Sequence, residues 1–289
     1  MKQKILILGK GYIGNAIARY LDPDIRKILH ISKAELDYTN PTTLKLFLEA
    51  GRFDYVINCA GYTGKPNVDA AEDNKELCWK LNVVDSVQIN RACRDVQANY
   101  IHIGSGCIYN DIVDATEEDV PNFGLYNSES SFYSKSKHAY ETLVGDYGLT
   151  LRIRMPFDDT LSSKNYLYKL WTYPKLIGYN TFNSKTSISD ICRFIAHILY
   201  EEVDVRNIGL LNFVNPNPRS TSSIVEDLME DVHWPRAEYE WVDEQSLNLK
   251  AKRSNCCLSS EKRKTLFPNF HMPVEADAIT KCLSEMRDL

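Results

Sequence analysis

Residues 4–20 read KILILGKGYIGNAIARY: a short apolar run, then glycines, then a helical pattern. The apolar run at 4–8 predicts a buried strand, and the pattern at 12–21 predicts a helix. The turn between them, GKGYIG (9–14), has the G-x-G-x-x-G spacing that lets a backbone approach a pyrophosphate at a helix N-terminus. This stretch therefore predicts a dinucleotide-binding turn in an α/β fold, and the alternative is an ordinary glycine-rich turn.

The chain repeats this alternation as far as residue 155. Strand-like runs and helical stretches alternate, with strands at 27–31, 54–58, 99–104 and 149–154 and helices at 41–50, 75–97 and 133–147. Strands that alternate with helices are typical of a parallel, doubly wound sheet, and runs this apolar indicate a sheet covered on both faces. We therefore expect a Rossmann sheet and a dinucleotide-binding domain over 1–155.

Beyond Pro156 the alternation weakens, which indicates a second, smaller part of the molecule. The remaining patterns are a helix at 188–200, a strand at 210–214, a turn at 215–220 and helical stretches near 221–231 and 274–287. We expect the elements at about 183–214 to return to the sheet. The segments 156–182 and 215–289 are expected to form a substrate-binding lid over its carboxyl edge.

Composition excludes several classes of protein. The chain has 289 residues and a net charge of −5, and it is 44% hydrophobic, which is typical of a globular protein. Negative charge disfavours nucleic acid as a partner, and no apolar run is long enough for a membrane helix. The N-terminal residues lack a secretory pattern, so we expect a cytoplasmic location, the host cytoplasm for a viral protein. The eight cysteines include no C-x-x-C pair, so we expect free thiols and no metal site.

The end of the second predicted strand indicates which dinucleotide binds. NAD sites usually carry an acidic residue here, about 20 residues after the glycines, that binds the ribose. We read that residue as missing, because this chain has Ser32 and Lys33 at the strand end. A hydroxyl and a cation suit the 2′-phosphate of NADP, so we expect NADPH as cofactor. NADH is the alternative if Lys33 is a solvated surface lysine.

A Tyr-x-x-x-Lys pair indicates the chemistry. Tyr133 and Lys137 are four residues apart in a predicted helix, so both lie on one face. An ammonium beside a phenol favours the phenolate, so we expect Lys137 to lower the pKa of Tyr133 toward neutrality. Ser105 follows the fourth strand, at the edge where open α/β sheets bind ligands. With the glycine turn and the NCAG turn at 58–61, these residues resemble the extended short-chain dehydrogenase/reductases.

Longer strings sharpen this resemblance and occur in one order along almost the whole chain. They are NCAGYTGKPNVDAAE (58–72), GSGCIYND (104–111), EEDVPNF (117–123), SFYSKSK (131–137), LRIRMP (151–156), NFVNP (212–216) and RSN (253–255). Together they resemble the bifunctional nucleotide-rhamnose synthases (epimerase-reductases) of plants and giant viruses, which are related to dTDP-rhamnose reductase and GDP-fucose synthase. The glycine turn departs from the pattern, because these relatives usually show G-x-x-G-x-x-G.

The resemblance implies an activity and a set of catalytic residues. Such enzymes convert UDP-4-keto-6-deoxy-D-glucose to UDP-L-rhamnose by inverting C3 and C5 through an enolate and then reducing C4 with NADPH. It implies that Ser105, Tyr133 and Lys137 act in reduction, and that Cys107 and Lys169 act in epimerisation. A thiol and an amine exchange protons near neutrality when charge or burial tunes them. Without the resemblance, Cys107 is a buried thiol and Lys169 a solvated lysine.

The sequence and the resemblance also indicate binding residues. The cofactor is expected to contact Gly9, Gly11, Tyr12, Ile13, Gly14, Ser32, Lys33, Cys59, Ala60, Gly61, Tyr62, Tyr133 and Lys137. The nucleotide sugar, on UDP or dTDP, is expected to contact Thr63, Ser105, Gly106, Tyr133, Arg154, Asn165 and Arg253.

Three other functions stay open at this point. They are a reductase that receives its substrate from a separate epimerase, a non-catalytic reductase-like regulatory subunit, and a related sugar-nucleotide dehydratase or 4-epimerase. The pair Cys107 and Lys169 favours the bifunctional enzyme over the first, and the complete Ser–Tyr–Lys set disfavours the second. By analogy with extended reductases, we also expect a homodimer that pairs through the helices at 75–97 and 133–147.

Overall fold

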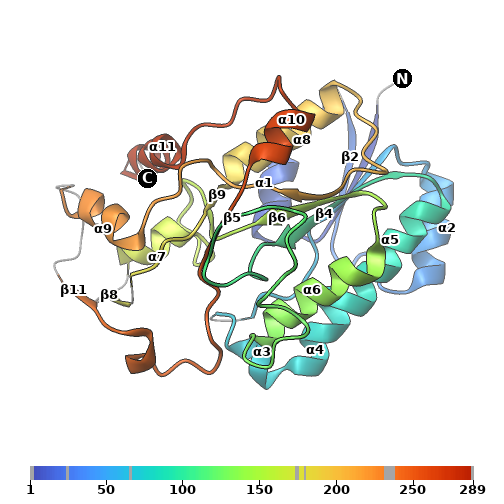
Figure 1. Ribbon diagram of the computed structural model, residues 1–289. Helices are drawn as coiled ribbons and strands as arrows, with labels where there is room; N and C mark the ends of the chain where they lie inside the picture. Colours follow the sequence, from blue (N-terminus) through green and yellow to red (C-terminus); the bar gives the residue numbers. More distant parts are fainter. Residues whose placement is uncertain are drawn as a thin grey trace.

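The computed structural model describes residues 3–23, 26–64, 67–172, 176–178, 180–230 and 238–287. Its centre is a six-stranded parallel sheet with the order β10-β6-β4-β3-β1-β2 (Figure 1). The strands are β1 (Lys4–Leu8), β2 (Lys27–Ile31), β3 (Tyr55–Asn58), β4 (Asn99–Ser105), β6 (Leu149–Ile153) and β10 (Gly209–Asn212). The predicted parallel α/β sheet is therefore confirmed, including the strand that returns from the second part of the chain.

The order of the strands determines where a ligand binds. From β1 the chain moves to β2 on one side and then to β3 on the other, so the winding reverses between β1 and β3. Open α/β sheets bind ligands at such a reversal, at the carboxyl ends of the strands. The glycine turn follows β1 and the NCAG turn follows β3, so both lie at this point.

Helices cover both faces of the sheet because alternate side chains of each strand point to opposite faces. Ile5 and Ile7 pack in one core with α1 and α8, whereas Leu6 and Leu8 pack in another with α2 and α5. The helix α6 lies beside α5 (Figure 1). Their bounds are α1 (Tyr12–Tyr20), α2 (Pro41–Gly51), α5 (Ser86–Asp95), α6 (Phe132–Val144) and α8 (Ile188–Tyr200).

The helix predicted at 75–97 is interrupted in its middle. It consists of α4 (Lys75–Trp79), a π-helical turn η1 (Lys80–Asp85) and α5. A π-helical turn widens the helix locally and is frequent at functional sites. Here it carries Asn82, whose side chain contacts the loop after β3.

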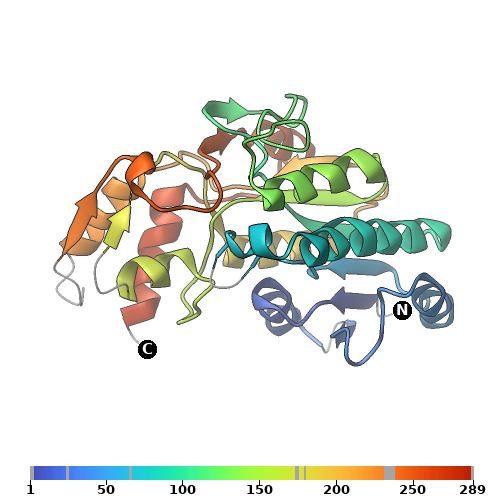
Figure 2. The same cartoon turned by 90° about the horizontal axis from the view of Figure 1, so that it is seen from below.

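A second hydrophobic core lies at one end of the molecule, away from the sheet (Figures 1 and 2). Phe157, Leu167, Leu228 and Ile279 are among its buried side chains. Its helices are α7 (Tyr166–Thr172), α9 (Thr221–Met229) and α11 (Glu275–Arg287). Two short parallel sheets accompany them: β7 (Pro156–Phe157) pairs with β9 (Thr186–Ser187), and β8 (Leu176–Gly178) pairs with β11 (Tyr239–Trp241). Position 231 of the helix predicted at 221–231 lies outside the described residues.

One part of the segment expected in the lid lies with the sheet instead. The helix α10 (Glu261–Leu266) contacts β10, and Phe267 and Phe270 pack in the core formed by α1, α8 and the sheet. Phe194 of α8 makes edge-to-face contacts with both rings, at 4.8 and 5.0 Å between centroids, which is the physical reason for this placement. The strand β12 (Cys256–Leu258), which precedes α10, pairs with β5 (Ile112–Ala115).

Across the described ranges, no helix combines the length and apolar character needed to span a membrane.

Candidate active site

The glycine turn between β1 and α1 is shaped for an anion. Gly9 has a φ of +97°, and a Cβ there would lie 2.8 Å from the backbone nitrogen of Ala60. A Cβ on Gly14 would lie 2.1 Å from the carbonyl oxygen of Gly9, so both positions require glycine. Gly11 faces open space, and α1 has neither a side-chain cap nor an acidic residue in its first turn. This uncapped helix N-terminus fits the diphosphate of a dinucleotide.

The two residues after Gly11 have structural contacts. The hydroxyl of Tyr12 donates to Oδ1 of Asp158 at 2.6 Å, and burial raises the pKa of Tyr12. Asp158 follows β7, so this hydrogen bond joins the glycine turn to the start of the second part of the chain. Ile13 packs against the core of the sheet.

The end of β2 corrects the prediction that no acidic residue lies there. Glu35 accepts hydrogen bonds from the backbone nitrogen and hydroxyl of Ser32, at 2.8 and 2.7 Å. The chain turns back after β2, with the Glu35 nitrogen donating to the Ser32 carbonyl, so a residue four positions beyond the strand reaches its end. Lys33 is exposed beside this turn.

The loop after β3 is held by buried amides. Asn58 accepts from the Ala60 nitrogen at 3.0 Å, which fixes the turn. Asn82 accepts from the Tyr62 nitrogen at 2.7 Å and donates to the Tyr62 carbonyl at 3.0 Å. Asn82 also donates to Ser136 Oγ on α6, at 3.0 Å. The NCAG turn is therefore connected through the π-helical turn to the helix that carries Tyr133 and Lys137.

Three other members of this loop have contacts of their own. A Cβ on Gly61 would lie 3.7 Å from Nζ of Lys137, so the loop passes close to that ammonium. Cys59 packs against the core of the sheet, and burial raises the pKa of its thiol. Thr63 accepts from Nζ of Lys164 at 3.1 Å, so the 160s segment reaches over to this loop.

The structure brings Ser105, Tyr133 and Lys137 together at the carboxyl edge of the sheet. Ser105 ends β4 and its hydroxyl interacts with the phenol of Tyr133, while Nζ of Lys137 lies 5.8 Å from the centroid of the Tyr133 ring. Cys107 is beside them, since its nitrogen donates to Ser105 Oγ at 3.2 Å and its side chain packs in the cluster of Tyr133. All three triad side chains are at most 9% exposed, so water has little access to the group.

Burial dominates the ionisation of this cluster. It raises the pKa of Tyr133, and the hydrogen bond with Ser105 offsets that rise only in part. Burial also lowers the pKa of Lys137 to about 8. The expectation of a lowered pKa at Tyr133 is therefore wrong, because loss of hydration outweighs the lowering effects of Ser105 and Arg154. Tyr133 is a protonated phenol at neutral pH, which suits a proton donor.

Helix α6 is fixed at its start by two caps. Ser131 accepts from the Ser134 nitrogen at 3.1 Å, and Glu72 on α3 (Ala70–Asp73) accepts from the Phe132 nitrogen at 2.6 Å. A carboxylate at a helix N-terminus is stabilised by the helix dipole. These caps hold the first turn of α6, where Tyr133 lies.

Lys169 and Arg253, two further predicted site residues, lie on segments outside the Ser105 cluster. Lys169 lies on α7, half-buried, and burial lowers the pKa of its amine. Arg253 forms a bidentate pair with Asp69, at 2.6 and 3.0 Å, and is 23% exposed in its side chain. No contact joins either residue to the Ser105 cluster among the described interactions.

Three predicted sugar-binding residues have structural contacts within the protein. Arg154 is 2% exposed, and its guanidinium donates to the Gly106 carbonyl, to Asn183 and to Ser254. Gly106 also has its nitrogen bonded to the Ile153 carbonyl at 3.0 Å. Asn165 is fully buried, and both ends of its amide bind backbone groups of residues 158–167. Protein groups therefore take hydrogen-bonding positions of Arg154 and Asn165, which hold the surrounding loops, and contact of these residues with a sugar stays a prediction.

Four positioning residues escaped the sequence reasoning: Glu35, Glu72, Asn82 and Asp158. Glu35 stands at the spacing expected of a ribose-binding acid, 21 positions after Gly14, and that spacing was the available signal. The other three act through contacts between distant segments, which no local pattern reveals.

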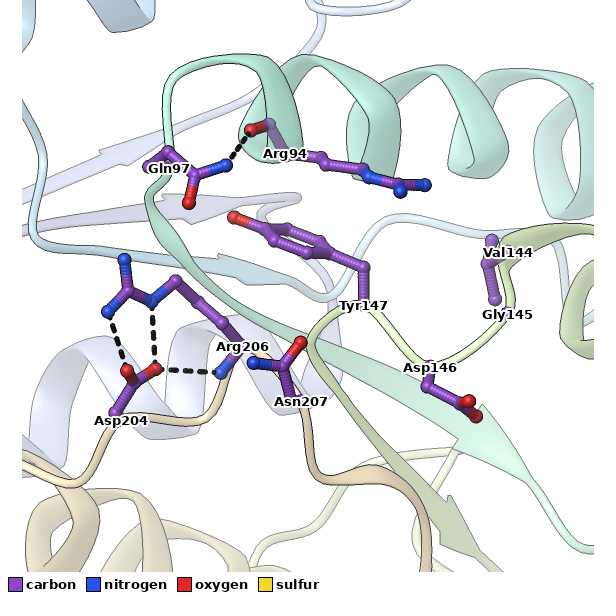
Figure 3. A pocket seen from close by; sticks show the side chains of 9 residues that line it. All are labelled: Arg94, Gln97, Val144, Gly145, Asp146, Tyr147, Asp204, Arg206 and Asn207. Carbon is purple, nitrogen blue, oxygen red and sulfur yellow. Dashed lines mark hydrogen bonds and ion pairs between the residues drawn. The ribbon is translucent and has the colours of Figure 1, made fainter.

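A hollow of about 730 Å³ lies at the opposite edge of the sheet (Figure 3). Its lining comes from the residues that precede β4, β6 and β10, and includes Arg94, Tyr147 and Asn207. Because the Ser105 cluster lies at the carboxyl ends of the strands, this hollow is separate from it.

Comparison with known proteins identifies relatives. The chain is 30% identical over 282 residues to a trifunctional UDP-glucose 4,6-dehydratase/UDP-4-keto-6-deoxy-D-glucose 3,5-epimerase/UDP-4-keto-L-rhamnose-reductase of Arabidopsis thaliana, covering 92% of this chain but 40% of that protein. It is 32% identical over 237 residues to the bifunctional dTDP-4-dehydrorhamnose 3,5-epimerase/dTDP-4-dehydrorhamnose reductase of the same plant, covering 76% of this chain and 74% of that one. The family resemblance seen in the sequence strings is confirmed.

Solved structures show the same fold. The UDP-rhamnose synthase of Acanthamoeba polyphaga mimivirus superposes with a TM-score of 0.83 at 23% identity, over 99% of this chain and all of that one. A dTDP-4-dehydrorhamnose reductase of Bacillus anthracis, solved in complex with NADP, superposes with a TM-score of 0.82 at 18% identity, over 99% of this chain and 100% of that one. The profile of one family matches residues 3–287, and the chain belongs to that family, the RmlD substrate binding domain family.

Proposed function

We propose that this protein is an NADPH-dependent 4-ketoreductase of a nucleotide 6-deoxy sugar that also epimerises C3 and C5, forming UDP-L-rhamnose from UDP-4-keto-6-deoxy-D-glucose. The observation that carries the reductase is the buried Ser105–Tyr133–Lys137 cluster beside the uncapped N-terminus of α1. The names of the plant relatives support both the substrate and the two reactions.

NADPH fits the residues present. The open position at Gly11 would hold the diphosphate, and Lys137, whose Nζ lies beside the loop at Gly61, would hold the nicotinamide ribose. When bound, NADPH supplies the hydride that reduces C4. Tyr133 donates its proton to the C4 oxygen, and Ser105 donates a hydrogen bond to the same oxygen. The charge of Lys137 then stabilises the phenolate left on Tyr133.

The epimerase chemistry uses the same oxygen. A proton at C3 or C5 leaves to a base, the electrons move to the C4 carbonyl, and a proton returns to the other face. Ser105 and Tyr133 stabilise the enolate oxygen by hydrogen bonds. Cys107 and Lys169 are proposed as the proton-exchanging pair, supported by the position of Cys107 next to Ser105 and by the lowered pKa of Lys169.

We also propose that the second core around α7, α9 and α11 is the lid that binds the nucleotide sugar. The contacts from Asp158 to Tyr12 and from Lys164 to Thr63 support it, because they join this part of the chain to the cofactor turns.

We also propose a cytoplasmic location, with which eight free cysteines are consistent, and cell fractionation tests it.

Isotope exchange tests the epimerase. In heavy water, we expect the wild-type protein to place deuterium at C3 and C5 of the product, measured by NMR. We expect Cys107→Ala to lose this exchange while reducing an already epimerised 4-keto sugar at a rate within about threefold of wild type, because its thiol is not in the reductive set. The control Cys282→Ala removes a thiol from the second core and should keep both reactions. Reduction without deuterium in the wild-type product would leave a reductase alone.

A homodimer through the helices α4–η1–α5 and α6 stays a prediction. Leu77, Val84 and Leu143 are 47%, 40% and 54% exposed on these helices, and such apolar side chains favour pairing. Light scattering should give about twice the 33.1 kDa mass of the chain. A monomeric mass at micromolar concentration contradicts the pairing.

A further inference from the structure

Three hydrogen-bond donors converge on one carboxylate at the end of β2. Glu35 accepts from Nζ of Lys10 at 2.6 Å, from the nitrogen of Ser32 at 2.8 Å and from the Ser32 hydroxyl at 2.7 Å. The contact with Lys10, followed by those with Ser32, lowers the pKa of Glu35 to about 2. Glu35 is therefore an anion held on an ammonium, a hydroxyl and a backbone amide.

This cluster lies at the end of β2, beside the glycine turn. Lys10 is part of the glycine turn, and the Gly9 nitrogen donates to the Ile31 carbonyl at the last residue of β2, at 2.9 Å. In dinucleotide-binding sheets, the ribose lies over this strand end, and the groups there determine whether a 2′-hydroxyl or a 2′-phosphate is accepted. An ammonium, a hydroxyl and an amide are the donors that a phosphate monoester takes.

We propose that Glu35 is an internal anion that occupies the 2′-phosphate position and limits the preference of this protein for NADPH over NADH. The proposal rests on the proposed cofactor role. A 2′-phosphate has to displace the carboxylate from Lys10 and Ser32, whereas a 2′-hydroxyl is able to donate to it. Since half of the Glu35 side chain is exposed, displacement costs little, and both dinucleotides are accepted.

The sequence alone indicated NADP because it shows the residues at the end of β2 but not how the turn after that strand folds. Ser32 and Lys33 are adjacent in the chain and suit a phosphate, but the turn brings Glu35 onto Ser32 and cancels one positive charge, that of Lys10. Replacing Glu35 by glutamine keeps the size of the side chain and removes its charge. That change leaves Lys10 available to the phosphate.

Equilibrium binding of ADP-ribose and of 2′-phospho-ADP-ribose, measured by calorimetry on the whole chain, tests the proposal without any sugar substrate. We expect Glu35→Gln to tighten the 2′-phosphorylated ligand by about five- to tenfold and to weaken ADP-ribose or leave it unchanged. In the Glu35→Gln background, Lys10→Met should reverse the gain. Glu49→Gln, an exposed change of the same charge on α2, is the matched control and should leave both affinities unchanged.

The outcomes separate this proposal from the proposed function. If neither ligand binds the wild-type chain, the dinucleotide site fails and the role of Glu35 fails with it. If both bind and Glu35→Gln leaves the ratio of their dissociation constants unchanged, Glu35 does not determine the preference, although the cofactor site stands.

Discussion

Replacing Tyr133 by phenylalanine is expected to slow ketone reduction about a thousandfold while NADPH still binds. The phenol interacts with the Ser105 hydroxyl, and burial keeps it protonated at neutral pH. Without it, the oxygen formed at C4 has no acid to protonate it. The measurement is single-turnover NADPH oxidation with the 4-keto sugar, with cofactor binding followed separately by fluorescence.

The matched control for Tyr133→Phe is Tyr140→Phe on the same helix. Tyr140 is buried against His102, with ring centroids 4.2 Å apart, and belongs to a different hydrophobic cluster from Tyr133. Its variant should reduce the ketone within a few-fold of wild type. Ketone reduction by Tyr133→Phe at more than a tenth of the wild-type rate would rule out Tyr133 as the acid.

The rate of ketone reduction by the wild-type protein is expected to fall as pH rises through about 8, because Lys137 then loses the charge that stabilises the phenolate.

Removing the carboxylate of Glu275 is expected to lower the free energy of unfolding by about 3–5 kcal/mol. Glu275 and Lys185 are both fully buried, with Nζ of Lys185 3.0 Å from Oε1 of Glu275. Glu275 also accepts from the backbone nitrogens of Lys185 and Arg219, at 3.0 and 2.9 Å. Glu275→Ala therefore leaves a buried ammonium without its counter-charge and two amides without their acceptor.

Urea and thermal unfolding measure this loss, which corresponds to a fall of about 10 °C in Tm. The control is Glu261→Ala, which removes an exposed ion pair with Lys264 and should change stability by less than about 0.5 kcal/mol. The double variant Lys185→Met with Glu275→Leu should recover much of the loss, because replacing both charges by apolar groups removes the unpaired ammonium. An unchanged Tm in Glu275→Ala would show that the pair does not hold this region together.

The sheet was predictable because its signal is local. In KILIL every residue after Lys4 is apolar, and the structure buries alternate side chains of these four against α1 and α8 on one face and α2 and α5 on the other. The spacing of Gly9 and Gly14 was equally informative, since each meets backbone where a Cβ would collide. Tyr133 and Lys137 could be paired from the helical period alone.

The environment of those residues was not predictable in the same way. The pKa of Tyr133 depends on how completely the cluster is buried, which is decided by segments far apart in the chain. Arg154 was expected to face the sugar, but Asn183 and Ser254 surround its guanidinium. These contacts join segments about 30 and 100 positions away, so no sequence window contains them.

The sequence by itself therefore determined the fold class, the order of the strands along the chain, the glycine turn and the Ser105, Tyr133 and Lys137 set. The tertiary structure alone decided the surroundings of the polar side chains: it placed Glu35 on Ser32, buried Arg154 and Asn165 among protein hydrogen-bond partners, and desolvated Lys137. The physical reason is the range of the interactions. Backbone periodicity and glycine sterics act over a few residues, whereas hydration and charge pairing depend on every segment that packs nearby.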